Sequence, residues 1–160
     1  MNIVYIGIGS NLGDRWGNIQ RAKWLLEGER GKVVVKRTSP LYETEALCRP
    51  GQTMPNFVNG VWEVETDLSP EALLQSLEVV EKLLGREGKG EWVSRPIDLD
   101  ILFYSDQVFE SQRLKIPHPE SERRWFVLKP LSDLAPDLVH PISKKTIKEI
   151  LCNFSSTRPM

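Results

Sequence analysis

The chain has 160 residues, of which 40% are hydrophobic and 27% are charged, and its formal net charge is −1. This composition predicts a single globular domain over residues 1–160, with enough apolar residues to form a core. The near-zero charge argues against a protein that binds nucleic-acid backbones. No apolar run reaches the ~20 residues of a membrane span, and the first residues do not resemble a signal peptide. We therefore expect a cytoplasmic protein with no membrane partner.

The charge is distributed unevenly along the chain. Residues 1–110 carry 12 basic and 17 acidic side chains, whereas residues 111–160 carry 9 basic and 5 acidic ones. The basic excess in the last third suits an anionic small ligand, but it is also typical of a solvated surface. Charge alone leaves both interpretations open.

The predicted elements follow the order β-α-β-β-α-β. Strands are expected at residues 3–8, 33–37, 57–65 and 97–104, and helices at 16–29 and 70–84. The second helix begins with Ser69-Pro70-Glu71, a capping hydroxyl followed by proline and an acid in the first turn. Prolines predict a loop over residues 40–55, and a turn near Ser105 predicts a short hairpin arm. This order predicts an α+β, ferredoxin-like fold: an antiparallel sheet with helices packed on it and a C-terminal helical extension.

The fourth predicted strand carries the sharpest chemical signal. Asp98 and Asp100 alternate with Ile97, Leu99 and Ile101, so both carboxylates point to the same side of the strand. Two such carboxylates repel unless a cation lies between them, and Mg²⁺ favours oxygen ligands together with substrate phosphates. An exposed acidic strand face is the competing explanation, although aspartate is depleted in strands.

Basic side chains flank this pair on both sides. The preceding loop contains Arg86, Lys89 and Arg95 together with Trp92, and guanidinium groups are suited to binding phosphate oxygens. A second cluster consists of Arg113, Lys115, His118, Arg123, Arg124 and Phe126. Each group is also compatible with an ordinary surface loop. We interpret the other histidine, His140, as structural.

Several ordered motifs resemble those of the 6-hydroxymethyl-7,8-dihydropterin pyrophosphokinase family. They are residues 5–13 (YIGIGSNLG), 39–44 (SPLYET), 57–59 (FVN), 84–86 (LGR), 97–102 (IDLDIL) and 117–119 (PHP). The resemblance covers the chain from Tyr5 to about Leu134, and the family has the ferredoxin-like order described above. It implies an ATP-dependent enzyme of folate biosynthesis that transfers pyrophosphate to the hydroxymethyl group of the pterin and leaves AMP. It also implies a monomer.

The resemblance assigns roles position by position. Asp98 and Asp100 match the residues that hold two Mg²⁺ ions bound with ATP, and they are grouped with Arg86 and Arg95 as catalytic residues. Positions matched to ATP contacts are Glu81, Arg86, Arg95, Ile101, Arg113, Leu114, Lys115, His118 and Arg124. Positions matched to the pterin pocket are Thr44, Leu47, Phe57, Asn59, Trp92, Asp98 and Phe126. Phe57 and Phe126 would lie on the two faces of the pterin ring, and Asn59 at its polar edge.

The chain departs from the family pattern at three places. Val93-Ser94 stands where the family commonly has Gly-Pro, Gly88 stands where many members have a second arginine, and Glu45-Ala46 replaces prolines after Thr44. None of these changes removes a predicted metal ligand or a ring-stacking position. We therefore expect an active enzyme whose loops differ from those of other members.

Two other functions compete with this hypothesis. The ferredoxin-like fold also serves non-enzymatic ligand-binding or regulatory modules, which have no need for two aspartates beside arginines. A Gly-Ser turn with an Asp-x-Asp pair is also found in nucleotidyltransferases, but here Ser10 and Asp98 lie far apart in the sequence. The residues 9–11 resemble a phosphate-binding turn only weakly, since no Walker motif occurs.

Overall fold

A four-stranded antiparallel sheet forms the centre of the molecule, and a short fifth strand joins it at one place. The computed structural model describes residues 1–45, 50–51, 53, 55–85 and 96–157. The four long strands are β1 (Asn2–Ser10), β2 (Val33–Thr38), β4 (Phe57–Thr66) and β5 (Asp98–Tyr104). Their order in the sheet is β2-β4-β1-β5, and each neighbouring pair is antiparallel. The predicted α+β, ferredoxin-like arrangement is confirmed.

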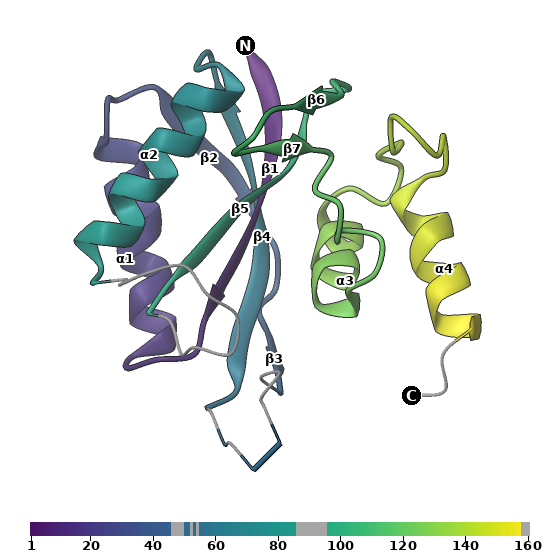
Figure 1. The fold of residues 1–160 in the computed structure, drawn as a ribbon, viewed down its shortest axis with the longest axis horizontal. Helices are drawn as coiled ribbons and strands as arrows, with labels where there is room; N and C mark the ends of the chain where they lie inside the picture. The colour runs from purple at the N-terminus through teal and green to yellow at the C-terminus, as the bar shows by residue number, and fades with distance from the viewer. Residues whose placement is uncertain (46–49, 52, 54, 86–95, 158–160) are drawn as a thin grey trace.

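Helices cover both faces of this sheet (Figure 1). Helices α1 (Arg15–Gly28) and α2 (Pro70–Leu83) lie on one face, and α3 (Trp125–Leu134) and α4 (Ile147–Thr157) lie on the other. The last two helices are the predicted C-terminal extension. Within the residues that the structure describes, no helix is both long and apolar enough to cross a membrane.

Local sequence signals explain where α1 and α2 begin. The Ser69 side chain accepts a hydrogen bond from the Ala72 amide, and Pro70 occupies the first turn of α2, as predicted. Asp14 caps α1 in the same way by accepting from the Gly17 amide at 3.0 Å. Both helices begin next to an end of a sheet strand, so the caps help to direct them back along the sheet.

The alternation of side chains in the strands builds two separate cores. Val58, Trp62 and Val64 of β4 pack against α1 and α2, whereas Val61 faces α3 and α4. A bulge between β1 and β5 at Tyr5 and Ile6 interrupts this alternation. Beyond it, Leu102 and Phe103 both join the second core, which also contains Tyr5, Leu128, Leu131, Leu134, Ile147 and Ile150.

Two short features lie outside the four-stranded plan. Strand β3 (Tyr42–Thr44) pairs with the start of β4, so the prediction of an irregular loop over residues 40–55 is wrong for these three residues. Their structure depends on a distant pairing partner, which local propensity does not reveal. Strands β6 (Phe109–Glu110) and β7 (Lys115–Ile116) form the two-stranded arm that the turn near Ser105 predicts.

Candidate active site

The acidic pair lies at the N-terminal end of the edge strand β5. Leu99 and Ile101 are buried in the core beneath α2, and the alternating Asp98 and Asp100 are half-buried on the opposite side. Both aspartates line two adjoining cavities, and His118 lines both as well. The pair therefore lies at the meeting point of two binding spaces, an arrangement suited to a reaction between two ligands.

The first space, here called the arm-side cavity, lies between α2, β5 and the β6–β7 arm and has a volume of about 340 Å³. Its lining includes Glu81, Asp98, Asp100, Ile101, Arg113, Leu114, Lys115 and His118. Seven of the nine positions that the family resemblance matches to ATP contacts are described by the structure, and six of these line this cavity. The seventh, Arg124, lines the second space instead.

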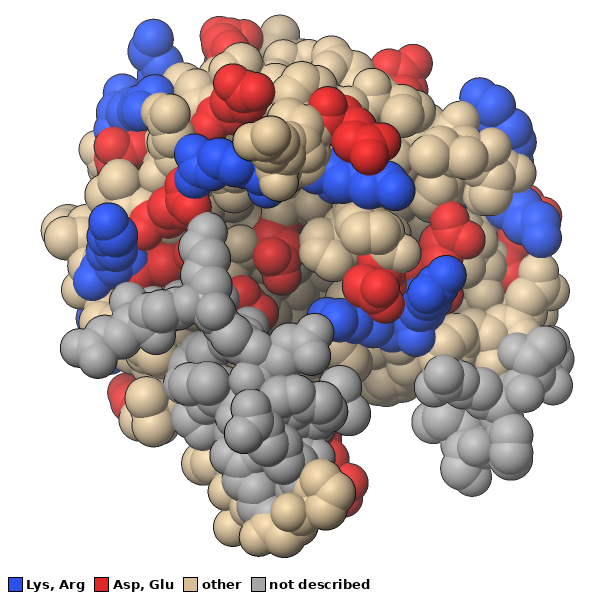
Figure 2. All heavy atoms as spheres, viewed as in Figure 1, with Lys and Arg blue, Asp and Glu red and all other residues tan. Residues whose placement is uncertain are grey.

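The second space, here called the helix-side pocket, lies between β1, β4, β5 and the beginning of α3. Its lining includes Gly9, Asn59, Asp98, Asp100, His118, Arg124 and Phe126. Figure 2 shows a hollow in the surface with acidic side chains inside it and basic side chains along its rim. Such an arrangement suits a ligand whose negative charge is bound between cations and side-chain donors.

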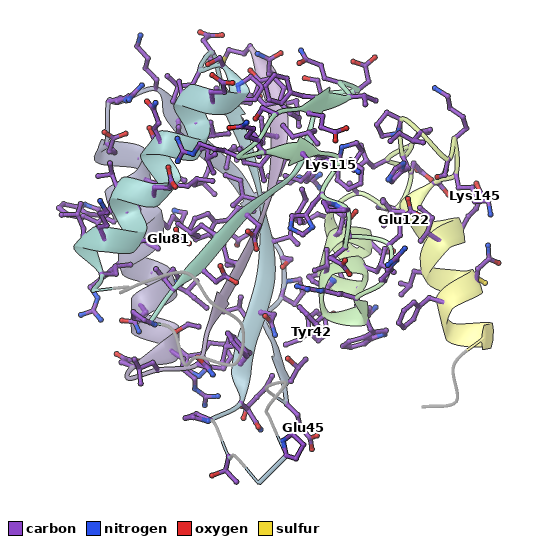
Figure 3. The ribbon with its side chains drawn as sticks, in the orientation of Figure 1. Tyr42, Glu45, Glu81, Lys115, Glu122 and Lys145 are labelled. Atoms are coloured by element: carbon purple, nitrogen blue, oxygen red, sulfur yellow. The ribbon has the colours of Figure 1, made fainter. Side chains whose placement is uncertain are left out.

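Glu81 connects α2 to the strand that carries the aspartates. Its side chain is only 6% exposed, and its carboxylate accepts a hydrogen bond from the Leu99 amide at 3.0 Å. Leu99 lies between Asp98 and Asp100, so this bond fixes the backbone at the centre of the acidic pair. Figure 3 shows Glu81 on α2 beside β5. Glu81 also belongs to the lining of the arm-side cavity.

Four residues from three strands meet beside the helix-side pocket: Gly9 and Asn59 line it, and Thr44 and Phe57 lie next to them outside its lining. Asn59 is 6% exposed, and its side-chain amide donates to the Thr44 hydroxyl at 2.7 Å. A Cβ atom added to Gly9 would lie 2.9 Å from Asn59 Oδ1 and 3.5 Å from Phe57 Cδ1. Because Gly9 has no side chain, the Asn59 amide and the Phe57 ring can pack closely against it.

His118 and Arg124 come from the segment that links β7 to α3, and Phe126 lies in the first turn of α3. The His118 backbone amide donates to the Leu102 carbonyl at 3.0 Å, which attaches this segment to β5. Burial lowers the pKa of His118, and Arg124 adds to the effect while Glu120 and Asp98 oppose it. The His118 Nδ1 atom accepts from the Glu120 amide at 3.1 Å, so the neutral ring carries its proton on Nε2. The Arg124 guanidinium lies 5.7 Å from the centre of the Phe126 ring.

Arg113 on the β6–β7 arm is paired with Glu78 on α2. Both side chains line the arm-side cavity, so this ion pair joins the two elements that enclose it. Glu78 was not among the sequence-predicted site residues. Its position three residues before Glu81 on the same helix, where side chains share a face, is the signal that would have identified it.

The structure brings together the described part of the predicted site. Asp98 and Asp100 line both spaces, whereas Thr44 and Phe57 lie beside Asn59 and Gly9 but are not among the residues that line the helix-side pocket. The predicted residues Leu47, Arg86, Trp92 and Arg95 lie outside the described residues. The predicted roles of all these residues remain predictions.

The donor set can also be compared with what Mg²⁺ requires. Among the described residues, no group of three or more His, Cys, Asp or Glu side chains is arranged to hold a metal ion. A pair of half-buried carboxylates on one strand face fits Mg²⁺, which commonly takes one or two carboxylates and completes its shell with water and substrate phosphates. The same pair would be a poor site for zinc, which is usually held by several nitrogen or sulfur ligands.

Comparisons with known proteins agree with this geometry. The sequence model of the 7,8-dihydro-6-hydroxymethylpterin-pyrophosphokinase (HPPK) family matches residues 5–136. A 2-amino-4-hydroxy-6-hydroxymethyldihydropteridine pyrophosphokinase of Aquifex aeolicus is 40% identical over 149 residues, which cover 93% of this chain and 90% of that protein. The folic acid synthesis protein fol1 of Schizosaccharomyces pombe is 44% identical over 149 residues, but these cover only 20% of its length.

Solved structures show the same fold. The chain matches a crystal structure described as HPPK-DHPS in complex with substrates with a TM-score of 0.73 and 15% sequence identity. The match covers 98% of this chain and 46% of the other, so this chain spans less than half of that larger protein. The family model and the Aquifex relative, rather than the fold, decide the relationship: the chain belongs to the 7,8-dihydro-6-hydroxymethylpterin-pyrophosphokinase family.

Proposed function

We propose that this chain transfers pyrophosphate from ATP to the hydroxymethyl oxygen of 6-hydroxymethyl-7,8-dihydropterin in folate biosynthesis. The products are the pterin diphosphate and AMP. In this reaction an oxygen–Pβ bond forms, the bond between Pβ and the bridging oxygen of the α-phosphate breaks, and the hydroxyl proton is released. The observation that carries the proposal is the pair of adjoining spaces that share Asp98, Asp100 and His118.

The two spaces differ in the ligand that each suits. The arm-side cavity combines the apolar Ile101 and Leu114 with the cationic Arg113 and Lys115, which suits a base and a chain of phosphates. The helix-side pocket offers the Phe126 ring and the fixed Asn59 amide, which suit a flat heterocycle with a polar edge. We assign ATP to the first and the pterin to the second.

Transfer between these sites depends mainly on alignment and on relief of negative charge. Asp98 and Asp100 would hold the two Mg²⁺ ions implied by the family, which when bound neutralise charge on the phosphate oxygens. Arg124, which also lines the helix-side pocket, can neutralise further charge. The His118 Nε2–H group supplies a neutral hydrogen-bond donor close to the aspartates. Arg86 and Arg95 are assigned phosphate contacts by the family resemblance alone.

The direct test is to identify the product of ATP cleavage. Purified chain incubated with ATP, Mg²⁺ and the hydroxymethyl pterin should form AMP and pterin diphosphate in equal amounts, and neither without the pterin. Formation of ADP, or no pterin-dependent AMP, would refute the proposal. Release of free pyrophosphate with a nucleotidylated product would favour nucleotidyl transfer instead, and magnesium-dependent ATP binding unaffected by Asp98→Ala would favour a non-enzymatic module.

We also propose that the chain acts as a cytoplasmic monomer. Support for this comes from the family resemblance and from the near-zero net charge without an apolar run of membrane length. Light scattering on the eluate of a size-exclusion column should report a mass near 18.3 kDa. A mass of twice that value would contradict the monomer.

A further inference from the structure

The turn between α3 and α4 carries a buried side chain, His140, that contacts residues next to the candidate site. This residue lies beyond residues 5–136, the part of the chain that the family model matches. It is 4% exposed, and its Nε2 atom lies 2.7 Å from Glu122 Oε1. Its ring and the ring of Phe103 on β5 form a T-shaped pair, with the ring centres 5.5 Å apart and the planes at 90°. His140 thus contacts both the strand that carries the acidic pair and the segment before α3.

The His140 ring is held in a single orientation. The Nδ1 atom accepts hydrogen bonds from the backbone amides of Ile142 and Ser143, each at 3.2 Å. Because Nδ1 accepts, the ring proton of the neutral form lies on Nε2 and is donated to the Glu122 carboxylate. Burial lowers the pKa of His140 while Glu122 opposes the shift, so the neutral form predominates near pH 7.

The turn around His140 is itself anchored to the rest of the extension. The His140 amide donates to the Lys145 carbonyl at 2.8 Å, and the Lys144 amide donates back to the His140 carbonyl at 2.9 Å. Ile147 and Ile150, which follow on α4, are buried in the second core. The ring is therefore fixed on a rigid support, and Glu122 lies on the side of its segment that faces this support (Figure 3).

Glu122 lies on a tightly bonded turn between two residues of the site. The amide and the hydroxyl of Ser121 both donate to the His118 carbonyl, at 3.1 and 2.8 Å, and the Arg123 amide donates to the Glu120 carbonyl at 3.0 Å. Ser121 is 1% exposed. A displacement of Glu122 would therefore be passed on to His118 and Arg124, which line the helix-side pocket.

We infer that His140 and Glu122 form a positioning pair through which the C-terminal extension sets the place of His118 and Arg124 relative to the acidic pair. Neither side chain lines the arm-side cavity or the helix-side pocket. Their effect on the reaction is therefore exerted through the backbone of residues 118–124. This inference rests on the proposed function for its kinetic consequence, but the contact itself is tested without catalysis.

The first experiment compares Glu122→Ala with Glu122→Gln. Glu122 is 41% exposed, so both variants should fold. The alanine variant loses the acceptor, and we expect kcat/KM for the pterin to fall about tenfold, with a smaller change in KM for ATP. The glutamine variant keeps an acceptor oxygen and should recover most of this loss. Equal kcat/KM values for wild type and Glu122→Ala would overturn the inference.

The matched control lies in the same extension but does not contact Glu122. Glu149 accepts hydrogen bonds from the amide and the hydroxyl of Thr146, at 3.3 and 3.0 Å, at the start of α4. Glu149→Ala should lower the Tm without a comparable fall in kcat/KM measured well below the transition. If Glu149→Ala reduced kcat/KM as much as Glu122→Ala, the effect would be general destabilisation and the positioning pair would be refuted.

A double variant and a measurement independent of activity complete the test. His140→Phe keeps a ring against Phe103 but removes both the Nε2 donor and the Nδ1 acceptor of the Ile142 and Ser143 amides. Adding Glu122→Ala to His140→Phe should therefore change kcat/KM by no more than about twofold. Amide hydrogen exchange at residues 118–124 should be about tenfold faster in Glu122→Ala than in wild type. If hydrogen exchange in Glu122→Ala equalled that of wild type, the positioning pair would be refuted whether or not wild type forms AMP. If exchange were faster in Glu122→Ala but wild type formed no pterin-dependent AMP, only the proposed function would be refuted.

Discussion

Substituting alanine for Gly9 tests whether the floor of the helix-side pocket determines affinity for the pterin. The added Cβ would lie 2.9 Å from Asn59 Oδ1, whereas optimal separations of non-bonded atoms are about 3.5 Å. The Asn59 amide would have to move by roughly half an ångström. That amide is buried and already bonded to Thr44 at 2.7 Å, so the shift would weaken this bond as well.

The expected magnitude follows from the cost of misplacing a positioned group. A displacement of about 1 Å can cost about 100-fold in rate, so half that displacement suggests about tenfold. We expect KM for the pterin to rise about tenfold in Gly9→Ala, while KM for ATP changes less than about twofold. The reason is that Asn59 lines the helix-side pocket, which is assigned to the pterin, and does not line the arm-side cavity, which is assigned to ATP.

The assay is pterin-dependent AMP formation at varied pterin and at varied ATP. Gly7→Ala is the matched control, because Gly7 lines the same pocket two residues earlier on β1 but its added methyl group would meet Leu102 instead of Asn59. Its Cβ would lie 3.3 Å from Leu102 Cδ2, the end of a flexible side chain that can rotate away. If Gly7→Ala raised the pterin KM as much as Gly9→Ala, the effect would not depend on the displacement of Asn59. If Gly9→Ala left the pterin KM unchanged, the assignment of the pterin to this pocket would be wrong.

Three further predictions concern the acidic pair, its support and the pH dependence of stability. Asp98→Asn and Asp100→Asn should each lower kcat at least about 100-fold with Mg²⁺ present, while Tm changes little. Measuring kcat over a titration of Mg²⁺ would show this decrease, and a near-normal kcat would refute the assignment of Mg²⁺ to these residues. Glu81→Ala leaves the Leu99 amide without this acceptor and should cost about 2 kcal/mol in unfolding free energy, measured in urea. The folded-state pKa of His140 is below its usual 6.5, so the unfolded state binds more protons, and the free energy of unfolding should fall as pH drops below about 6.5. His140→Phe should show a weaker fall in urea unfolding measured across this pH range. An equal fall in wild type and variant would contradict His140 as the cause.

The sequence predicts the main architecture because local patterns and core burial agree. Ser69 and Pro70 define the start of α2, and the β-α-β-β-α-β order predicts the antiparallel sheet with helices packed on it. The sequence does not predict β3, since three residues after a proline form a strand only because β4 lies beside them. Trp16 fits the apolar stripe of α1 by spacing but is 49% exposed, because it lies in the first turn of that helix.

The candidate site is predictable where it is continuous in sequence and not where it depends on distant pairs. The alternation around Asp98 and Asp100 predicts their common side from the strand period alone. The bond between Glu81 and Leu99 joins two elements, and no local pattern specifies it. The contact between Glu122 and His140 likewise connects residues on different turns, and only the packing of α4 on the second core brings them together.

The position of β5 at the border of the sheet has a consequence for solubility. Within the described part of the chain, β1 is the only strand that pairs with β5, so the other edge of β5 pairs with no strand. The unpaired backbone groups of such an edge strand can pair with a strand of another molecule, and charged side chains on edge strands commonly prevent this association. Asp98 and Asp100 place two negative charges at this border. Neutral substitutions at these positions should therefore increase aggregation at high protein concentration, in addition to their effect on catalysis.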